Sequence, residues 1–462
     1  MQSIAEISET KDAIDYMRSA RDASQEGNLA AGSFAGAIIA PSDRLGGHPM
    51  KKFAVVAAMA TALLGSTAAF AAELEVTHWW TSAGEAAAIA EFAKVFEEQT
   101  GNTWVDSALA GSGTGANPVI ISRIIGGDPM GATQMNTGRD AEELIQAGLM
   151  RDLTDVVADL DIESFYVDKS LLDPCRFEGG LYCLPINIHS WDWLWLSTAA
   201  YEKIGQPVPK DWNEYVASWP ALQEAGILPF GLATGWPISG VPGVLMSGLG
   251  GSDLVLAINR DKDVEAVRGP EFRKVAEALD SLRQVISPDM MVPSFGDVGT
   301  QLLEGTAAGN IHGDWLQGDL QVAGGVPGET YECLPALGLG DQLTGGGDSF
   351  YFPKLPEGTD QAVIDAQAQL ARILISPEAQ LKFNMVKGSM PIRTDIDLAA
   401  ANPCMQKALG MLDAGLLPSG DFALSSDSQQ QLTDLSTEFL DDDSITVDDY
   451  VERYASIIES AE

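Results

Sequence analysis

The chain has 462 residues, with 27 Lys and Arg against 66 Asp and Glu, and a formal net charge of −39 at pH 7. Such a charge repels nucleic-acid phosphates and anionic membranes, so it argues against nucleic-acid partners and suits a soluble protein. The length is more than one hydrophobic core usually supports, and it predicts two lobes.

A secretory signal is predicted at 50–71. It begins with MKK, continues with the twelve apolar residues FAVVAAMATALL and ends in AFA, a small-x-small cleavage site. Twelve apolar residues are too few to cross a bilayer, which needs about 20. We therefore expect export, and we interpret residues 1–49 as a non-native extension upstream of the true initiator, Met50. The alternative, a cytoplasmic extension ahead of a signal anchor, is disfavoured by the short apolar run.

Four cysteines follow the signal and fit an oxidising compartment. Cys175 and Cys183 flank RFEGGLY, in which EGG is typical of a hairpin tip, so the two sulfurs could meet. Cys333 would then pair with Cys404 by elimination. Four buried thiols are the alternative. A zinc site is disfavoured, because no CxxC motif or His pair at ligand spacing is present.

The first predicted strand lies in ELEVTH and ends at Trp79 and Trp80. Leu74, Val76 and His78 alternate with other residues at the period of a strand. Ligands of open α/β sheets bind outside the carboxyl ends of the strands. The two indoles could give a ligand an apolar face or pack under the following helix, and both interpretations stay open.

The next helix opens with a capping box formed by Ser82 and Glu85. Glu85 is therefore either a cap or, one turn from Trp80, an acceptor of hydroxyl groups. A second strand is expected at 104–108. The glycine-rich GSGTG at 111–115 is interpreted as a flexible turn before a helix, because no Gly-Lys-Ser/Thr follows it.

A short strand at 132–135 is followed by Asn136. Gln134 and Asn136 lie at i and i+2 and so share one face. Two amides at a strand end supply both donors and acceptors for hydroxyl groups. The alternative is that they are ordinary surface polar residues.

The segment LPINIHSWDWLWLS carries three tryptophans at strand period, Trp191, Trp193 and Trp195. Three indoles on one strand face favour sheet packing over a binding surface. His189, at the entry to this strand, is expected to be structural unless it lies between two lobes.

Four further positions lie in loops or at the ends of predicted elements, and the loop at Trp236 could present its indole. Trp236 lies in the loop TGWP, and Trp315 ends IHGDW. Asp348 lies in the glycine-rich turn GGGDSF, and Lys387 follows a predicted helix in KGSMP. Helices are expected at 271–285, 360–375 and 377–386.

Seven motifs occur in one order: HWWTSAGE, RIIGGDP followed by TQMN, LPINIHS, KDWNEY, GDW, GDSF and SPEAQLKFNMVKGSMPIR. Together they resemble the periplasmic sugar-binding proteins of bacterial ABC importers, the extracellular solute-binding family 1, most closely its glucose/mannose-binding branch. The resemblance covers essentially all of 73–462. It implies an α/β fold of type II with two lobes, a hinge crossed more than once and an interlobe ligand cleft. It implies no catalysis, cofactor or metal.

The lobes are expected to alternate along the chain. We place lobe 1 at 72–185 and 339–388, and lobe 2 at 186–338 and 389–462, the last part including the C-terminal helices.

Where positions match, the resemblance implies a ligand-binding set with members in both lobes. This set is Trp79, Trp80, Glu85, Gln134, Asn136, His189, Trp236, Trp315, Asp348 and Lys387. The chain departs from the pattern of its relatives twice: Asn136 stands where they can place a His, and LLPSG at 416–420 lacks the late His of some glucose binders.

The expected function is the capture of a sugar, a monosaccharide such as glucose or mannose, in the periplasm. The receptor, a monomer, would deliver the sugar to the membrane permease of an ABC importer. An oligosaccharide or polyol receptor of the same fold is the alternative. A secreted glycoside hydrolase acting through Glu85 and Asp348 is disfavoured, because nothing fixes two acids at hydrolytic spacing and no G-x-S-x-G or H-E-x-x-H motif is present.

Overall fold

The computed structural model describes residues 71–461 except 138, 236, 287, 341 and 419–423. The predicted signal at 50–71, apart from its last residue, and the extension at 1–49 lie outside the described residues. So does Trp236, one of the predicted ligand residues.

A five-stranded sheet in the order β2-β1-β3-β12-β6 forms the centre of lobe 1. Its strands are β1 (Glu73–His78), β2 (Thr103–Ala108), β3 (Ala132–Met135), β6 (Cys183–Pro185) and β12 (Ser349–Tyr351). β1 pairs in parallel with β2 and β3, whereas β12 runs antiparallel to β3 and β6. The carboxyl ends of β1, β3 and β6 and the amino end of β12 therefore meet at one edge of the sheet.

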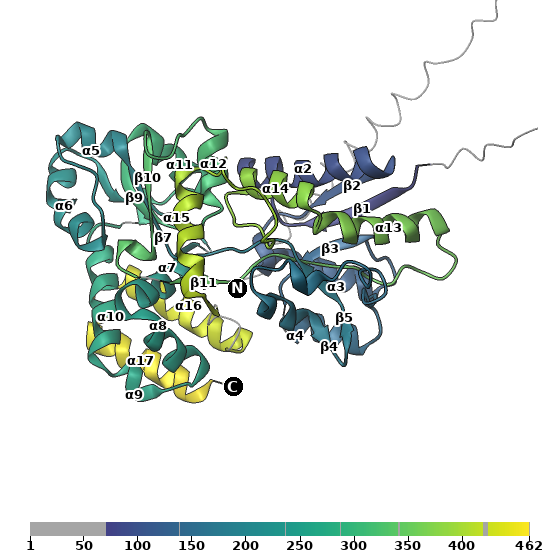
Figure 1. Cartoon of the computed structure of the whole chain (residues 1–462). Helices are drawn as coiled ribbons and strands as arrows, with labels where there is room; N and C mark the ends of the chain where they lie inside the picture. The colour runs from purple at the N-terminus through teal and green to yellow at the C-terminus, as the bar shows by residue number, and fades with distance from the viewer. Residues whose placement is uncertain are drawn as a thin grey trace, which may run out of the picture. The chain divides into compact units, whose positions relative to one another are not determined.

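Helices cover both faces of this sheet (Figure 1). They are α2 (Ala83–Thr100), α13 (Gln361–Leu374) and α14 (Pro377–Lys387) on one face, and α3 (Ser112–Ile125) and α4 (Arg139–Gln146) on the other. The predicted capping box at Ser82 and Glu85 starts α2, and Gly101 ends it in the left-handed conformation. Phe92 of α2 stacks on Phe383 of α14 at 4.1 Å between ring centroids, so the two helices share one core.

The predicted turn at 111–115 is wrong in one respect. α3 already begins at Ser112, and Gly111 precedes it with φ +105, a conformation that favours glycine. The helix therefore starts inside the glycine-rich segment and not after it.

A second sheet, in the order β10-β7-β9-β8, forms the centre of lobe 2. Its strands are β7 (Trp193–Ser197), β8 (Leu228–Phe230), β9 (Ala307–Ile311) and β10 (Tyr331–Pro335). β7 is antiparallel to both β9 and β10, and β8 is parallel to β9. The start of β7 and the end of β9 therefore lie at the same edge.

The helices of lobe 2 come from two parts of the chain, 198–322 and 426–460. They are α5 (Thr198–Ile204), α6 (Trp212–Glu224), α7 (Pro237–Leu245), α8 (Gly251–Val255), α9 (Val264–Val267), α10 (Pro270–Arg283), α11 (Phe295–Glu304), α12 (Leu316–Val322), α16 (Ser426–Asp441) and α17 (Val447–Ser460). The helical stretch 237–260, which contains α7 and α8, is long and apolar enough to cross a membrane by composition. However, 56% of its most apolar window is buried inside the protein, as in a core helix.

The described elements place three crossings between the lobes: from β6 to β7, from β10 to β12, and from α14 to α16. The crossing segments bond to one another, since Ile188 bridges to Met390 and His189 bridges to Gly346. The hinge is thus crossed more than once, as predicted. The residue boundaries that we assigned to the lobes stay predictions.

Both predicted disulfides are confirmed. Cys175 and Cys183 are joined across the hairpin of β4 (Arg176–Phe177) and β5 (Gly180–Leu181). Cys333 of β10 is joined to Cys404 of α15 (Pro403–Met411). The second bond ties the chain beyond the last crossing to the lobe 2 sheet.

Candidate functional site

Three predicted ligand residues lie at one edge of the lobe 1 sheet. Trp79 follows β1, Asn136 follows β3 and Asp348 precedes β12. Trp79 is half-buried and Asn136 is exposed, and both side chains approach Gly113 at the start of α3. Because the strand ends share one edge, an indole, an amide and a carboxylate gather there from distant parts of the sequence.

Asp348 is the centre of a hydrogen-bond network at this edge. Gln134 donates from Nε2 to Oδ1 at 2.6 Å, and Asn187 donates from Nδ2 to Oδ2 at 2.8 Å. His189 Nε2 lies 2.7 Å from the same Oδ2, and His189 Nδ1 lies 2.5 Å from Oδ1 of Asp314 in lobe 2. One imidazole therefore links a carboxylate of each lobe, and His189 does lie between the lobes.

The ionisable groups of this network shift one another's pKa values. Burial alone would lower the pKa of His189, but the charges of Asp314 and Asp348 outweigh it and raise the pKa to about 9. Burial would raise the pKa of Asp348, yet the charge and hydrogen bond of His189 lower it to about 2. Burial raises the pKa of Asp314, and His189 offsets this only in part. At neutral pH, His189 is therefore a cation facing the Asp348 anion.

A second buried ion pair joins the last residue of α14 to the first turn of α2. Lys387, the last residue of α14, is 1% exposed and donates from Nζ to Glu85 Oε1 at 2.8 Å. The same ammonium lies 5.2 Å from the ring centroid of Trp80. Glu85 also accepts the backbone N–H of Ser82, so it is the helix cap that the sequence offered as one alternative. Hydroxyl binding by Glu85 stays a prediction.

The two adjacent indoles after β1 have different surroundings. Trp80 is 2% exposed and packs against Phe350 and Phe383, with ring centroids 5.9 and 5.3 Å away. Trp79 stays half-buried, and its backbone N–H donates to Gln134 Oε1 at 3.1 Å. Trp80 is thus held in the lobe 1 core beside Lys387, while Trp79 gives a face to the sheet edge.

Lobe 2 contributes aromatic rings from the start of β7 and the end of β9. Trp315 donates from Nε1 to His312 Nε2 at 2.9 Å. Its ring is perpendicular to Trp191 at 4.6 Å and edge-on to His189 at 5.0 Å between centroids. Burial, with a smaller effect of Lys387, lowers the pKa of His312 to about 3, so this ring is neutral and can accept the indole proton.

The three alternating tryptophans of this region do not share one role. β7 begins at Trp193, and Trp193 and Trp195 are buried and stacked at 5.4 Å, as sheet packing predicts. Trp191 precedes the strand, is half-buried and lies against Trp315. It therefore belongs with the site residues, a role that the strand period had hidden.

A backbone contact joins the lobes beside the charge pair. Asp319 of α12 accepts from the Ser82 hydroxyl at 2.9 Å and from the Gly84 N–H at 3.2 Å at the start of α2. A Cβ on Gly84 would lie 2.4 Å from the carbonyl carbon of Gly318, so the close approach requires glycine there. Burial raises the pKa of Asp319, and the Ser82 bond opposes this.

Nine of the ten predicted ligand residues thus lie in one connected region of the described chain, and Trp236 lies outside that part. Their roles toward a ligand stay predictions. Sequence reasoning missed five neighbours: Asn187, Trp191, His312, Asp314 and Asp319. Asn187 at i−2 of His189 and Asp314 beside Trp315 could have been found from their motifs. The other three depend on contacts that no local pattern shows.

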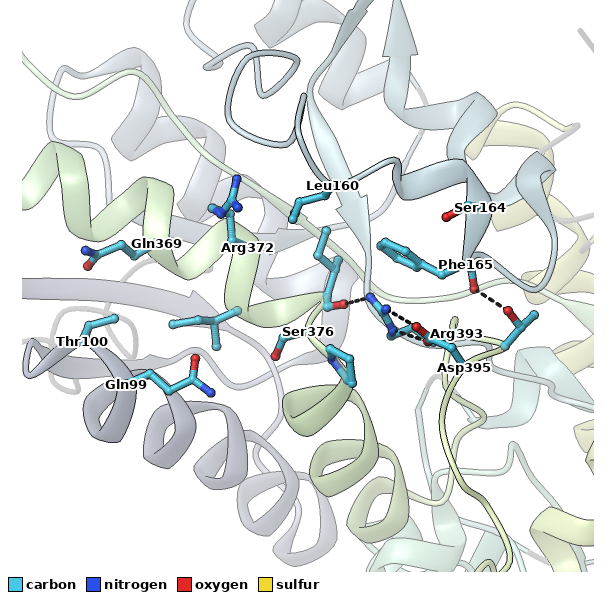
Figure 2. Close-up of a pocket in the computed structure, with 14 residues that line it drawn as sticks. Gln99, Thr100, Leu160, Ser164, Phe165, Gln369, Arg372, Ser376, Arg393 and Asp395 are labelled. Atoms are coloured by element: carbon cyan, nitrogen blue, oxygen red, sulfur yellow. Dashed lines mark hydrogen bonds and ion pairs between the residues drawn. The ribbon is translucent and has the colours of Figure 1, made fainter.

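A large pocket lies away from this region (Figure 2). It measures about 740 Å³ and is lined by residues including Gln99, Arg372 and Arg393. Gln99 is at the far end of α2 from Glu85, roughly 20 Å away at about 1.5 Å per residue. The guanidinium of Arg393 is bonded to Asp395 and the Ile375 carbonyl, and Arg372 is paired with Asp159. Both arginines that line this pocket are therefore already paired within the chain.

No group of three or more His, Cys, Asp or Glu side chains is placed to hold a metal ion in the part of the chain that the structure describes.

Two lobes joined by three crossings, with charged and aromatic groups meeting between them, define a solute-binding receptor of the type II periplasmic fold. Residues 87–410 match the family model of bacterial extracellular solute-binding proteins. A probable sugar-binding periplasmic protein of Rhizobium meliloti (strain 1021) is 32% identical over 365 residues, covering 78% of this chain and 86% of the relative. The chain belongs to the bacterial extracellular solute-binding protein family.

Solved structures with the same fold bind sugars of different sizes. The solute receptor AcbH, described as exclusive for β-D-galactopyranose, aligns with a TM-score of 0.68 at 16% identity, over 84% of this chain and 98% of that one. A chitin oligosaccharide binding protein aligns with a TM-score of 0.65 at 18% identity, over 85% and 99%. The fold alone therefore does not set the length of the ligand.

Proposed function

We propose that this chain is a periplasmic sugar receptor that closes on one pyranose ring, as in glucose or mannose, and delivers the sugar to the permease of an ABC importer. The Rhizobium meliloti relative, a probable sugar-binding periplasmic protein, supports a sugar ligand and a periplasmic location. In this proposal the export signal at 50–71 directs secretion, and the receptor acts as a monomer.

The observation that carries the proposal is the link that His189 makes between Asp348 in lobe 1 and Asp314 in lobe 2, at 2.7 and 2.5 Å. Around it lie planar hydrogen-bonding groups, which suit sugar hydroxyls. The indoles of Trp79 and Trp315 border the same region and suit the CH face of a pyranose. A neutral ring with several hydroxyl groups matches this combination.

Closure would couple binding to transport. A sugar that contacts both lobes favours the closed state only by the contacts that the open state lacks. At about 1 kcal/mol per neutral hydrogen bond, a few groups of lobe 2 would suffice. The contact of Asp319 with Ser82 and Gly84 adds closed-state bonds that involve no ligand.

The bonding of the two candidate acids argues against the alternative of a glycoside hydrolase. Both oxygens of Asp348 accept hydrogen bonds, and its pKa is lowered to about 2, which is the wrong direction for a general acid. Glu85 is paired with Lys387 and capped onto α2. Neither carboxyl group is arranged to donate a proton.

Calorimetric titration of the purified protein with glucose, mannose and xylose tests the proposal. We expect at least one of them to bind with micromolar or better affinity, and Asp348→Asn to weaken that binding tenfold or more. Asp413→Asn, at an exposed position, is the matched control and should bind as the wild type does. Maltose is titrated as well, and hydrolysis products in the titration cell, or no heat with any of the four sugars, would reject the receptor proposal.

A further inference from the structure

The start of helix α2 in lobe 1 is capped by a side chain of lobe 2. The Asp319 carboxylate of α12 accepts from the Ser82 hydroxyl through Oδ2 and from the Gly84 N–H through Oδ1, and both bonds join residues more than 230 positions apart. A carboxylate is favoured there, because the first N–H groups of a helix have no partner within it and form the positive end of its dipole. The lobes are therefore joined by a bond that usually lies within one helix.

A glycine from each lobe lets the two backbones touch at this point. α12 lies against the start of α2 and the end of α14 (Figure 1). A Cβ on Gly84 would lie 2.3 Å from the backbone nitrogen of Asp319, and a Cβ on Gly318 would lie 2.9 Å from the carbonyl oxygen of Val386. Because backbone atoms cannot turn aside as a flexible side chain can, the contact depends on both glycines.

The same cap is connected to the buried ion pair of the candidate site. Ser82 Oγ accepts the Glu85 N–H at 3.2 Å while it donates to Asp319. Glu85 accepts the Ser82 N–H in return and also accepts from Lys387. One chain of hydrogen bonds thus runs from Lys387 to Asp319, across both lobes and without a ligand.

The contact also carries a cost that favours separation of the lobes. Gln317 of α12 is 1% exposed, and its Nε2 makes no hydrogen bond to any residue that the structure describes. It lies against Gly388 at the end of α14, where a Cβ would lie 3.0 Å from Nε2. A buried donor without an acceptor is unfavourable, and separation would return it to water. Bonds that favour contact are thus opposed by a cost, as a reversible contact requires.

We propose that the bonds of Asp319 to Ser82 and Gly84 are a latch, which closes the lobes in the absence of sugar. Asp319 is then a positioning residue, which contacts no sugar and acts through the start of α2. A ligand that binds only the closed form has an apparent affinity in proportion to the fraction of protein already closed. The latch therefore raises the affinity without a contact to the sugar. This effect on affinity rests on the function proposed above, whereas the shape of the sugar-free protein does not.

Gly84→Ala separates a latch from permanent packing. The backbone of Gly84 is helical without positive φ, and alanine is the better helix former, so α2 itself tolerates the change. The added Cβ clashes with α12 only while the lobes touch. We expect the melting temperature to stay within about 2 °C of the wild type, or to rise, while the sugar-free protein becomes more extended.

Asp319→Asn weakens the latch without adding bulk, because it removes the charge and one of the two accepting oxygens. Asp449→Asn is its matched control, since Asp449 also accepts from a hydroxyl and a backbone N–H at a helix start, those of Thr446, but within lobe 2. Gly410→Ala is the control for the added methyl group, because Gly410 is an exposed helical glycine with open space around it.

The experiment measures the radius of gyration of the purified protein by small-angle X-ray scattering. Each protein is measured without sugar and with the tightest binder among glucose, mannose, xylose and maltose. We expect the wild type and the two controls to have the same radius in both conditions, and Asp319→Asn and Gly84→Ala to be larger without sugar. In calorimetric titration, Asp319→Asn should bind that sugar about tenfold more weakly than Asp449→Asn does.

The possible outcomes separate the latch from the receptor function. A wild type that contracts on binding sugar as much as the two latch variants do would overturn the latch and leave the receptor proposal standing. Sugar-free variants with the wild-type radius would overturn it as well, because α2 and α12 would then belong to one rigid body. If none of the four sugars binds, the receptor proposal is wrong, and the radii of the sugar-free proteins alone decide whether the latch exists.

Discussion

Lobe 1 and lobe 2 bring opposite chemistry to the site that they share. The lobe 1 side consists of charged and amide groups that already bond to one another, around Asp348 and between Lys387 and Glu85. The lobe 2 side consists mainly of rings, with Trp315 held by His312 and bordered by Trp191. Lobe 1 thus holds its polar groups in position before a ligand binds, and lobe 2 provides apolar aromatic faces.

The difference separates stability from recognition. A buried ion that loses its partner is costly whether or not a ligand is present. A half-buried ring at a cleft supports little of the core, but it can supply much of the binding energy. Substitution of the buried lobe 1 lysine, Lys387, should therefore change the free energy of unfolding most, and loss of the half-buried lobe 2 ring of Trp191 should change sugar affinity more than stability.

The largest effect is expected for Lys387→Met. Removing this ammonium leaves Glu85, whose side chain is 12% exposed, as an unpaired carboxylate in the interior. We expect a loss of about 3–5 kcal/mol in the free energy of unfolding, measured by urea denaturation. The double variant Lys387→Met/Glu85→Gln should recover part of this loss, because it removes both charges.

The same helix offers a matched control. Lys382 pairs with Glu378 at 2.7 Å in the i, i+4 position, with side chains 33% and 49% exposed. Lys382→Met should cost less than about 0.5 kcal/mol, as for exposed helical pairs. Equal losses in the two lysine variants would show that the buried Lys387–Glu85 pair stabilises the protein no more than an exposed pair does.

The edge of the lobe 1 sheet could be predicted from sequence because its determinants are local. Strand period located β1 and a short apolar run located β3, and the residues just beyond them, Trp79 and Asn136, follow directly. Asp348 and Lys387 were identified by resemblance, since a turn or a helix end does not by itself indicate what it faces.

What could not be predicted depends on register and on distant contacts. Trp191, Trp193 and Trp195 have the same spacing, but only the pairing with β9 and β10 shows that β7 begins at Trp193. Asp319 is one acid among many in an acidic chain, and its bonds to Ser82 and Gly84 span more than 230 residues.

A pH titration tests whether His189 holds the lobes together as a cation. A base whose pKa is raised on folding, here from 6.5 to about 9, stabilises the protein fully below pH 6.5 and loses that contribution as pH rises through 9. We expect the free energy of unfolding to fall by roughly 3 kcal/mol between pH 6.5 and 9.5. Asp348, whose pKa is lowered to about 2, contributes above pH 3.8 and loses its contribution as pH falls through 2, outside this window.

The variant His189→Gln identifies the residue responsible. It keeps groups able to hydrogen-bond but cannot titrate, so its stability should be nearly constant from pH 6.5 to 9.5. A wild type whose stability also stays constant in this range would mean that the His189 bridge carries no net charge interaction.

The smallest change in free energy, and the most specific, is expected for Trp191→Ala. This ring is half-buried and borders Trp315, so its loss should weaken sugar binding about tenfold, or about 1.4 kcal/mol, with a smaller change in unfolding. Trp193→Ala, two residues on, removes a ring that is 2% exposed and stacked on Trp195. It should cost about 3–5 kcal/mol of stability and leave the affinity of the folded protein unchanged. If the two variants lost the same affinity and the same stability, Trp191 would not be a binding ring distinct from the packed tryptophans of β7.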